Sequence, residues 1–184
     1  MSRPERHRPD FDEYFMGLAM AVRTRANCLG SRVGAVIVKG HRVLATGYNG
    51  TPSKMPNCMD GGCERCANPD KFESGQGYDL CICVHAEQNA LLAAARFGIS
   101  VEGGTVYSTM RPCFGCTKEL LQAGVERVVY IHDWQHPDPL FQNEYNRIQA
   151  RFPGGINKLN LPDPESAWAQ PAKKKTDATA HPPS

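Results

Sequence analysis

The stretch Val84-His85-Ala86-Glu87-Gln88-Asn89-Ala90 begins a predicted helix near the middle of this chain. Residues 86–96 are rich in alanine, leucine, glutamine and glutamate, which favour helix, and Gly98 is a suitable stop signal. His85 therefore lies at the N-terminus of the helix, and the carboxylate of Glu87 follows two residues later. A histidine and an acid in this order can supply a metal ligand and an acid–base group.

A second segment, Arg111-Pro112-Cys113-Phe114-Gly115-Cys116, places two thiols at the start of another predicted helix. Pro112 suits the first turn because its φ is fixed and it has no N–H. Cys113 and Cys116 share one helix face near the positive end of the helix dipole, which favours thiolate. Together with His85 they make three zinc ligands and leave the fourth tetrahedral position open.

Glu87 cannot easily chelate the same zinc ion as His85, but it can reach a water molecule at the open position. Zinc lowers the pKa of such a water toward neutrality, and Glu87 would transfer its proton. The alternative interpretation of the two thiols is a redox pair or half of a structural zinc site. A redox pair leaves His85 and Glu87 without a role, so the sequence favours catalytic zinc with Glu87 as the catalytic residue.

These motifs resemble the deoxycytidylate deaminases of the cytidine deaminase superfamily, whose zinc signature is His-x-Glu with Pro-Cys-x-x-Cys. The likeness runs from about Tyr14 to about Asp133. It includes three further pieces: Arg25-Ala26-Asn27-Cys28, Val33-Gly34-Ala35 and Gly47-Tyr48-Asn49-Gly50-Thr51-Pro52. The last piece, followed by a cysteine-rich insert, is typical of the deoxycytidylate branch. The resemblance implies hydrolytic deamination of dCMP to dUMP and ammonia, which supplies dUMP for thymidylate synthesis.

The resemblance also implies contacts to the nucleotide. Asn49 stands where relatives hydrogen-bond the nucleoside, although an asparagine before Gly50 also suits a turn. Arg25 resembles the family's phosphate contact, with a solvated arginine at a helix end as the alternative. Ala86 is a further expected substrate contact. Trp134 stands where many relatives have a tyrosine, which puts an aromatic contact from that segment in doubt.

In the family, the loop that corresponds to residues 47–52 also contributes to a regulatory site between subunits, where dCTP activates and dTTP inhibits. Hexameric assembly accompanies this regulation. The resemblance therefore implies a homo-oligomer, with a hexamer as the expected form. Some relatives are unregulated, so the sequence leaves control by dCTP and dTTP open.

A cysteine-rich insert at about residues 53–83 contains five of the eight cysteines. They are Cys58, Cys63, Cys66, Cys81 and Cys83. A loop of this length with few apolar residues needs a cross-link to hold one shape. Clustered cysteines without a secretion signal indicate metal, and four thiolates close a zinc site, which makes it structural. The predicted ligands of this second zinc ion are Cys58, Cys63, Cys66 and Cys81.

The fourth ligand is chosen between two cysteines. Cys81 is preferred because Cys83 lies only two residues before His85, where the chain is already committed to the active-site helix. Cys28 stands apart in the sequence and is expected to be a small buried hydrophobic residue. The alternative for the whole insert is a set of free thiols that form disulfides under oxidation.

Composition limits the remaining possibilities. With 184 residues, one domain with its own core is expected. The net charge is +2, and Lys173, Lys174 and Lys175 against Asp177 account for it, so no basic surface indicates a nucleic-acid binder. No apolar run approaches membrane-spanning length and the N-terminus has no signal region, which favours a soluble cytoplasmic protein.

The hydrophobic pattern predicts an alternation of helices and strands. Helices are expected over residues 11–25, 86–96, 113–123 and 139–151, and strands over 33–38, 42–47, 104–108, 127–131 and 156–161. A first hairpin followed by alternating elements predicts a mixed five-stranded sheet in an α/β fold, in agreement with the three-layer α/β/α fold that the resemblance implies. The folded domain is placed at residues 10–161, between disordered ends at 1–9 and 162–184.

Three functions are weighed. The first is a deaminase of free dCMP. The second keeps the chemistry with another substrate: CMP, dCTP, an antibiotic nucleotide precursor or a base in nucleic acid. The absence of a basic groove or a stacking series argues against a polynucleotide. The third is a zinc module that only binds partners, and Glu87 argues against it because a structural site has no use for an acid beside an open metal position.

Overall fold

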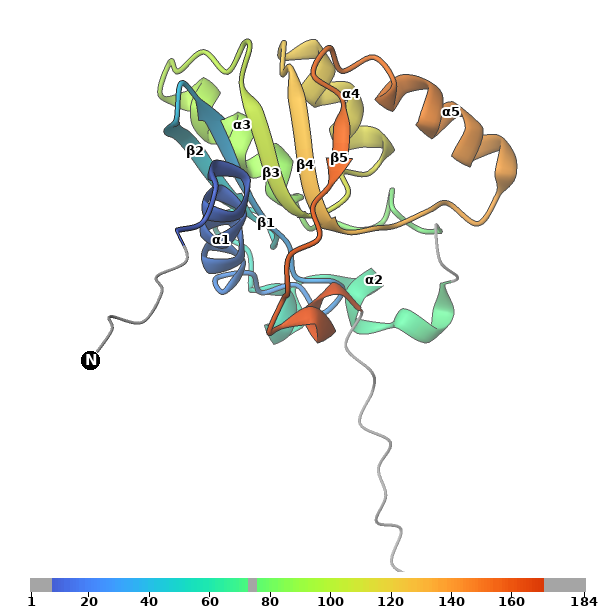
Figure 1. The fold of residues 1–184 in the computed structure, drawn as a ribbon. Helices are drawn as coiled ribbons and strands as arrows, with labels where there is room; N and C mark the ends of the chain where they lie inside the picture. The colour runs from blue at the N-terminus through green and yellow to red at the C-terminus, as the bar shows by residue number, and fades with distance from the viewer. Residues whose placement is uncertain (1–7, 73–75, 171–184) are drawn as a thin grey trace, which may run out of the picture.

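The computed structural model describes residues 8–72 and 76–170, and its centre is a five-stranded mixed sheet (Figure 1). The strand order is β2-β1-β3-β4-β5. β1 is antiparallel to both β2 and β3, whereas β3, β4 and β5 run parallel. The strands are β1 (Gly34–Lys39), β2 (Arg42–Tyr48), β3 (Thr105–Met110), β4 (Arg127–His132) and β5 (Ile156–Lys158). The predicted mixed five-stranded sheet is confirmed.

Helices cover both faces of the sheet. The longer ones are α1 (Phe11–Arg23), α3 (Ala86–Arg96), α4 (Phe114–Gln122) and α5 (Pro139–Gln149). Short helical turns are α2 (Glu64–Ala67), η1 (Cys58–Asp60), η2 (Pro69–Lys71) and η3 (Ser166–Ala169). Among the described residues, no helix has both the length and the hydrophobicity to cross a membrane.

The strand residues alternate between two apolar cores. Val36 and Val38 of β1 pack with Phe15 of α1 on one face of the sheet, whereas Ile37 points to the other face. There it meets Ala90 of α3 among the residues of the second core. This period of two is what a sheet covered on both faces requires. The predicted three-layer α/β/α arrangement is therefore confirmed.

Helix α1 begins with a reciprocal cap. The backbone N–H of Glu13 donates to Asp10 Oδ1 at 2.8 Å, and the backbone N–H of Asp10 donates to Glu13 Oε2 at 3.0 Å. Such a capping box satisfies two N–H groups that the first helical turn leaves free. The helix ends at Arg23, two residues before the expected Arg25, with Thr24 as its C-cap.

The folded part of the chain extends beyond the predicted boundary at residue 161. Residues 162–170, placed by composition in a disordered tail, pack beside the loop that follows α1. The backbone N–H of Arg32 donates to the carbonyl of Trp168 at 2.8 Å, and the Ser31 hydroxyl donates to the carbonyl of Ala169 at 2.8 Å. Residues 1–7 and 171–184, also predicted to be disordered, lie outside the described residues.

Candidate active site

Three predicted zinc ligands meet where helices α3 and α4 begin. His85 is the N-cap of α3, Cys113 is the N-cap of α4, and Cys116 lies in the first turn of α4. His85 Nδ1 lies 3.4 Å from Cys113 Sγ and 3.4 Å from Cys116 Sγ. A tetrahedral zinc ion with ordinary Zn–N and Zn–S bonds separates nitrogen and sulfur ligands by about 3.5 Å. The donor set and its spacing therefore fit zinc.

The backbone before α3 is fixed by close packing against β2. A Cβ on Gly47 would lie 2.1 Å from the carbonyl oxygen of Ala86, so only glycine lets the helix approach this strand. The backbones of Gly50 and Val84 form an antiparallel bridge, in which the Val84 N–H donates to the Gly50 carbonyl at 2.8 Å. The loop after β2, which contains Gly50, thus holds Val84, the residue that precedes His85.

Helix α5 supports the segment that precedes Cys113. The carbonyl of Pro112 accepts hydrogen bonds from the Tyr145 hydroxyl and from Gln149 Nε2, and both of these side chains are buried. Arg111 donates to Gln149 Oε1 at 2.6 and 2.8 Å. These contacts orient a ligand without touching the metal position, as outer partners of metal sites commonly do. This role of α5 does not follow from the sequence, because an amphipathic helix pattern does not reveal which loop its buried side chains reach.

The surroundings of Cys113 favour the ionised form of its thiol. The hydrogen bond from Cys116 and the neighbouring His85 lower the pKa of Cys113 to about 4, so this thiol is ionised at neutral pH. The Cys113 thiolate in turn raises the pKa of His85 to about 9. The hydrogen bond that Cys116 makes to Cys113, together with burial, raises the pKa of Cys116 well above its ordinary value. Thiolate is the form in which cysteine binds zinc.

Glu87 lies beside these ligands in the first turn of α3 and is only 3% exposed. The hydroxyl of Ser108, in β3, donates to Glu87 Oε1 at 2.7 Å. Burial raises the pKa of Glu87, although the His85 charge and the Ser108 hydrogen bond act in the opposite direction. A carboxyl group with a raised pKa beside a metal site is suited to exchange protons near neutral pH. No sequence signal marks Ser108, which resembles any other small residue of a buried strand.

Residues 9–132 match the family model described as the cytidine and deoxycytidylate deaminase zinc-binding region. The chain belongs to this family. The deoxycytidylate deaminase of Schizosaccharomyces pombe is 45% identical over 127 residues, which cover 69% of this chain and 38% of that protein. The deoxycytidylate deaminase of Mycobacterium phage D29 is 44% identical over 126 residues, which cover 67% of this chain and 95% of the phage protein.

The coverage differs among these relatives. The matching region spans only 38% and 42% of the lengths of the enzymes from S. pombe and Saccharomyces cerevisiae. A solved structure covers more of this chain: the dCMP deaminase from the cyanophage S-TIM5 in complex with dCMP and dUMP. That protein is 30% identical, with a TM-score of 0.63, and the likeness covers 84% of this chain and 100% of the phage chain. The fold is therefore that of the deaminase family.

The residues expected to contact the nucleotide differ in their burial and in the hydrogen bonds that they already make. Asn49 is buried, its Oδ1 accepts from the Val33 N–H at 2.8 Å, and its Nδ2 donates to the Ser31 carbonyl at 2.7 Å. Asn49 thus braces the loop before β1. Arg25 is exposed, and its guanidinium has no hydrogen bond or ion pair with another described residue. Ala86 is fully buried as the first residue of α3.

Trp134 belongs to an aromatic cluster beside the deaminase-family motif. Its ring packs edge-to-face against Tyr145 of α5 at a centroid distance of 6.1 Å, and against Tyr78 of the cysteine-rich insert at 6.4 Å. The hydroxyl of this same Tyr145 binds the Pro112 carbonyl. The tryptophan therefore connects the insert to the segment that carries Cys113.

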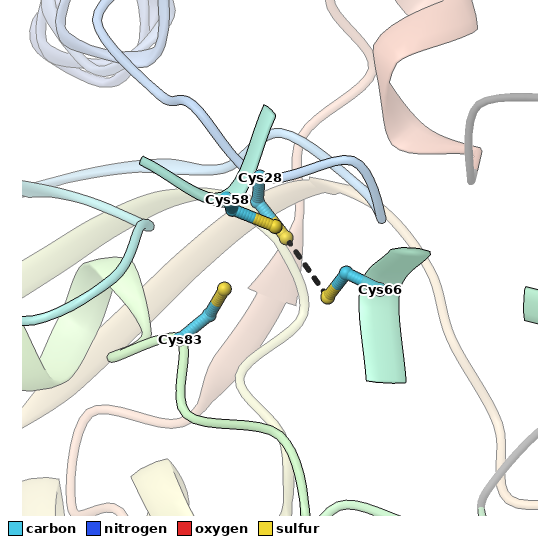
Figure 2. Close-up of side chains that lie close together, drawn as sticks. All are labelled: Cys28, Cys58, Cys66 and Cys83. Carbon is cyan, nitrogen blue, oxygen red and sulfur yellow. Dashed lines mark hydrogen bonds between the residues drawn. The ribbon is translucent and has the colours of Figure 1, made fainter. Parts of the chain in front are cut away.

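The cysteine-rich insert gathers its thiols differently from the prediction. Cys58, Cys63, Cys66 and Cys81 all lie in one cluster, but these four do not form one group of mutually close sulfur atoms. Each group of four close sulfurs contains Cys83, which was set aside as a ligand, and one of them contains Cys28. Figure 2 shows Cys28 with its sulfur directed at Cys66, 3.7 Å away. The interpretation of Cys28 as an isolated hydrophobic residue is corrected.

Proposed function

We propose that this chain catalyses the hydrolytic deamination of dCMP to dUMP and ammonia. The observation that carries the proposal is the buried carboxyl group of Glu87 beside the converging His85, Cys113 and Cys116. A site built only for structure has no use for a buried acid that none of its ligands requires. The substrate class is supported by the matched phage protein, whose structure contains dCMP and dUMP.

His85, Cys113 and Cys116 would hold the zinc ion. When bound there, zinc supplies Lewis-acid activation of water for attack on C4 of the base. The buried helix ends fix the three donors, so the reacting groups would meet with little reorganisation. The hydrogen bonds of Pro112 with Tyr145 and Gln149 keep Cys113 in place.

Glu87 would move two protons in sequence. It first takes a proton from water as the oxygen adds to C4, and delivers this proton to N3 of the base. It then takes the proton of the new hydroxyl group and delivers it to the amino group, after which the C4–N bond breaks and ammonia leaves. N3 keeps its proton and C4 becomes a carbonyl, which is uracil. One carboxyl group with a raised pKa serves both transfers.

Ser108 is expected to tune this carboxyl group. Its hydroxyl lowers the pKa of Glu87 against the effect of burial. Ser108→Ala should therefore raise that pKa further. The acidic limb of kcat/KM against pH should move to higher pH, because Glu87 must be ionised to accept the first proton. A uniform loss of activity with an unmoved acidic limb would mean that Ser108 supports only the packing of β3.

Recognition of the nucleotide involves residues at the edge of the site. Asn49 retains one amide N–H and one acceptor position after bracing the loop, and we propose that these contact the nucleoside. Backbone groups of Ala86, at the N-terminus of α3, would contact the base. Arg25 would bind the 5′-phosphate, since its guanidinium is exposed and without a partner among the described residues.

Arg25→Ala tests the monophosphate assignment. A hydrogen bond to a charged group contributes roughly 1.5–3 kcal/mol, which is about a 10- to 100-fold loss of kcat/KM for dCMP. The activity on deoxycytidine, which has no phosphate, should hardly change. Arg96→Ala is the matched control, because Arg96 is an exposed arginine at the end of α3, as Arg25 is an exposed arginine just after α1. Equal losses of activity on both substrates would mean that Arg25 stabilises the fold and does not bind the phosphate.

The experiment that tests the proposed function is an activity panel on the purified chain. The substrates are dCMP, CMP, dCTP, deoxycytidine and single-stranded DNA, and release of ammonia is the readout. We expect the highest kcat/KM with dCMP. A preference for CMP or dCTP would keep the chemistry and change the substrate, and equal rates on dCMP and deoxycytidine would remove the monophosphate assignment.

A further inference from the structure

Six cysteine thiols outside the catalytic site form a single cluster. Within it the sulfur atoms fall into two groups of four, and in each group all four lie within 4.8 Å of one another. The first group is Cys28, Cys58, Cys66 and Cys83, and the second is Cys63, Cys66, Cys81 and Cys83 (Figure 2 shows the first). Cys66 and Cys83 therefore belong to both groups.

We propose that this cluster binds two zinc ions that share the thiolates of Cys66 and Cys83. Two tetrahedra that share one edge have six corners, and the six thiols supply them. Cys28 and Cys58 would complete the first ion, and Cys63 and Cys81 the second. A single ion in either group would leave two thiols of the other group unused beside it. The sequence predicts one structural ion with four thiolates, and the shared sulfurs point instead to two.

The distances between sulfur atoms match this arrangement. Cys28 Sγ lies 3.7 Å from Cys66 Sγ, and Cys81 Sγ lies 3.8 Å from Cys66 Sγ and 3.9 Å from Cys63 Sγ. With Zn–S bonds of about 2.3 Å, the edge of a tetrahedral site is about 3.8 Å. A disulfide would bring its sulfurs to about 2.05 Å, and all six cysteines are free.

The surroundings of the thiols favour metal over a role in ordinary packing. The buried members of this cluster are all cysteines, and among the described hydrophobic residues Leu29 and the half-buried Cys81 pack against them. Among the described residues of the insert, the larger apolar side chains such as Met59, Leu80 and Ile82 are exposed and build no core of their own. A metal centre gives such a segment the stability that a small hydrophobic core would otherwise supply. The Leu29 N–H donates to Cys58 Sγ at 3.3 Å, which fixes the position of this sulfur.

The cluster joins segments that are distant in the sequence and ends next to the active site. Cys28 follows α1, Cys63 and Cys66 lie at α2, and Cys83 comes two residues before His85. Loss of the two ions would free the backbone that leads into α3. The cluster is thus a positioning device for a catalytic ligand, and its existence does not depend on which nucleotide is deaminated.

The first test is the metal content of the full chain, purified under reducing conditions. Elemental analysis should give three zinc ions per wild-type chain. Cys113→Ser removes a ligand of the catalytic site and should leave two. X-ray absorption on this variant should show a zinc–zinc scattering component, which an ion with four unshared thiolates lacks. One zinc ion in the variant, or iron in place of zinc, would overturn the proposal.

The second test uses a matched pair of thiols, one from each group. Cys28→Ser and Cys63→Ser should each lower the zinc content by at least one ion per chain. If a single ion occupied the first group, Cys63→Ser would leave the zinc content unchanged, and if it occupied the second, Cys28→Ser would do so. Either unchanged value would refute the shared site. The wild-type count and absorption spectrum decide the question even where a variant fails to fold.

Discussion

Replacement of Glu87 with glutamine is expected to slow deamination of dCMP by at least roughly 10²–10⁴-fold, the contribution of general acid–base transfer. Glutamine has nearly the same shape, and its amide oxygen can still accept the hydrogen bond from Ser108. It cannot carry the proton that moves from water to the base. The fold and the zinc content should therefore stay unchanged while kcat falls, which steady-state kinetics, circular dichroism and elemental analysis together will show.

His85→Ala is the contrasting variant for the same site. It removes a ligand rather than the proton carrier, so it should lose activity together with one zinc ion per chain. Glu87→Gln should lose activity with the zinc retained. Near-normal turnover of the glutamine variant would contradict the assignment of Glu87. Loss of zinc from that variant would assign Glu87 to the metal shell instead.

Local sequence patterns were sufficient to predict the helix ends at which His85, Cys113 and Cys116 come together. Helix α3 spans residues 86–96 as predicted. Its strong helix formers and the glycine stop just after it are local signals that can be read from neighbouring residues. Cys113 and Cys116 belong to the same first turn of α4, so their joint approach to His85 needed only that two helix ends meet.

The thiol cluster could not be assigned in the same way. Cys28 lies 38 residues before Cys66, and no local rule relates two positions so far apart. Cys83 was set aside because it is close to His85 in sequence, yet its side chain points to the cluster while the next residues turn into α3 (Figure 2). Asn49 shows the same limit, since its position before Gly50 does not reveal that its carboxamide binds Ser31 and Val33.

The C-terminal boundary of the folded domain, predicted from composition at residue 161, also differs from the structure. Prolines and small residues dominate after residue 161, and their average hides two side chains that bind the domain. Asp163 accepts hydrogen bonds from Arg23 at 2.6 and 2.7 Å, and it lies 2.6 Å from His132 Nε2. The guanidinium of Arg23 also stacks near Trp168, 5.4 Å from its ring centroid. An isolated acid and an isolated tryptophan give no periodic signal, so only the structure reveals this packing.

Asp163→Ala is expected to lower the free energy of unfolding by about 3–5 kcal/mol, the cost of leaving one member of a buried ion pair alone. The side chains of Arg23 and Asp163 are only 2% and 3% exposed. For a protein of this size the loss corresponds to a fall in Tm of roughly 6–20 °C. Glu144→Ala is the matched control, because Glu144 contacts Arg147 at the same 2.6 Å but on the surface, and it should change Tm little.

The pH dependence distinguishes lost charge pairing from lost packing. The hydrogen bonds from Arg23 hold the pKa of Asp163 well below its ordinary value, and the pKa in the unfolded chain is about 3.9. A depressed pKa stabilises the fold above the unfolded value, and that stabilisation disappears as the pH falls through the folded one. The difference in unfolding free energy between wild type and Asp163→Ala should therefore be constant near neutral pH and shrink below about pH 4. A difference that stays constant through acidic pH would mean that Asp163 acts by shape, without its charge.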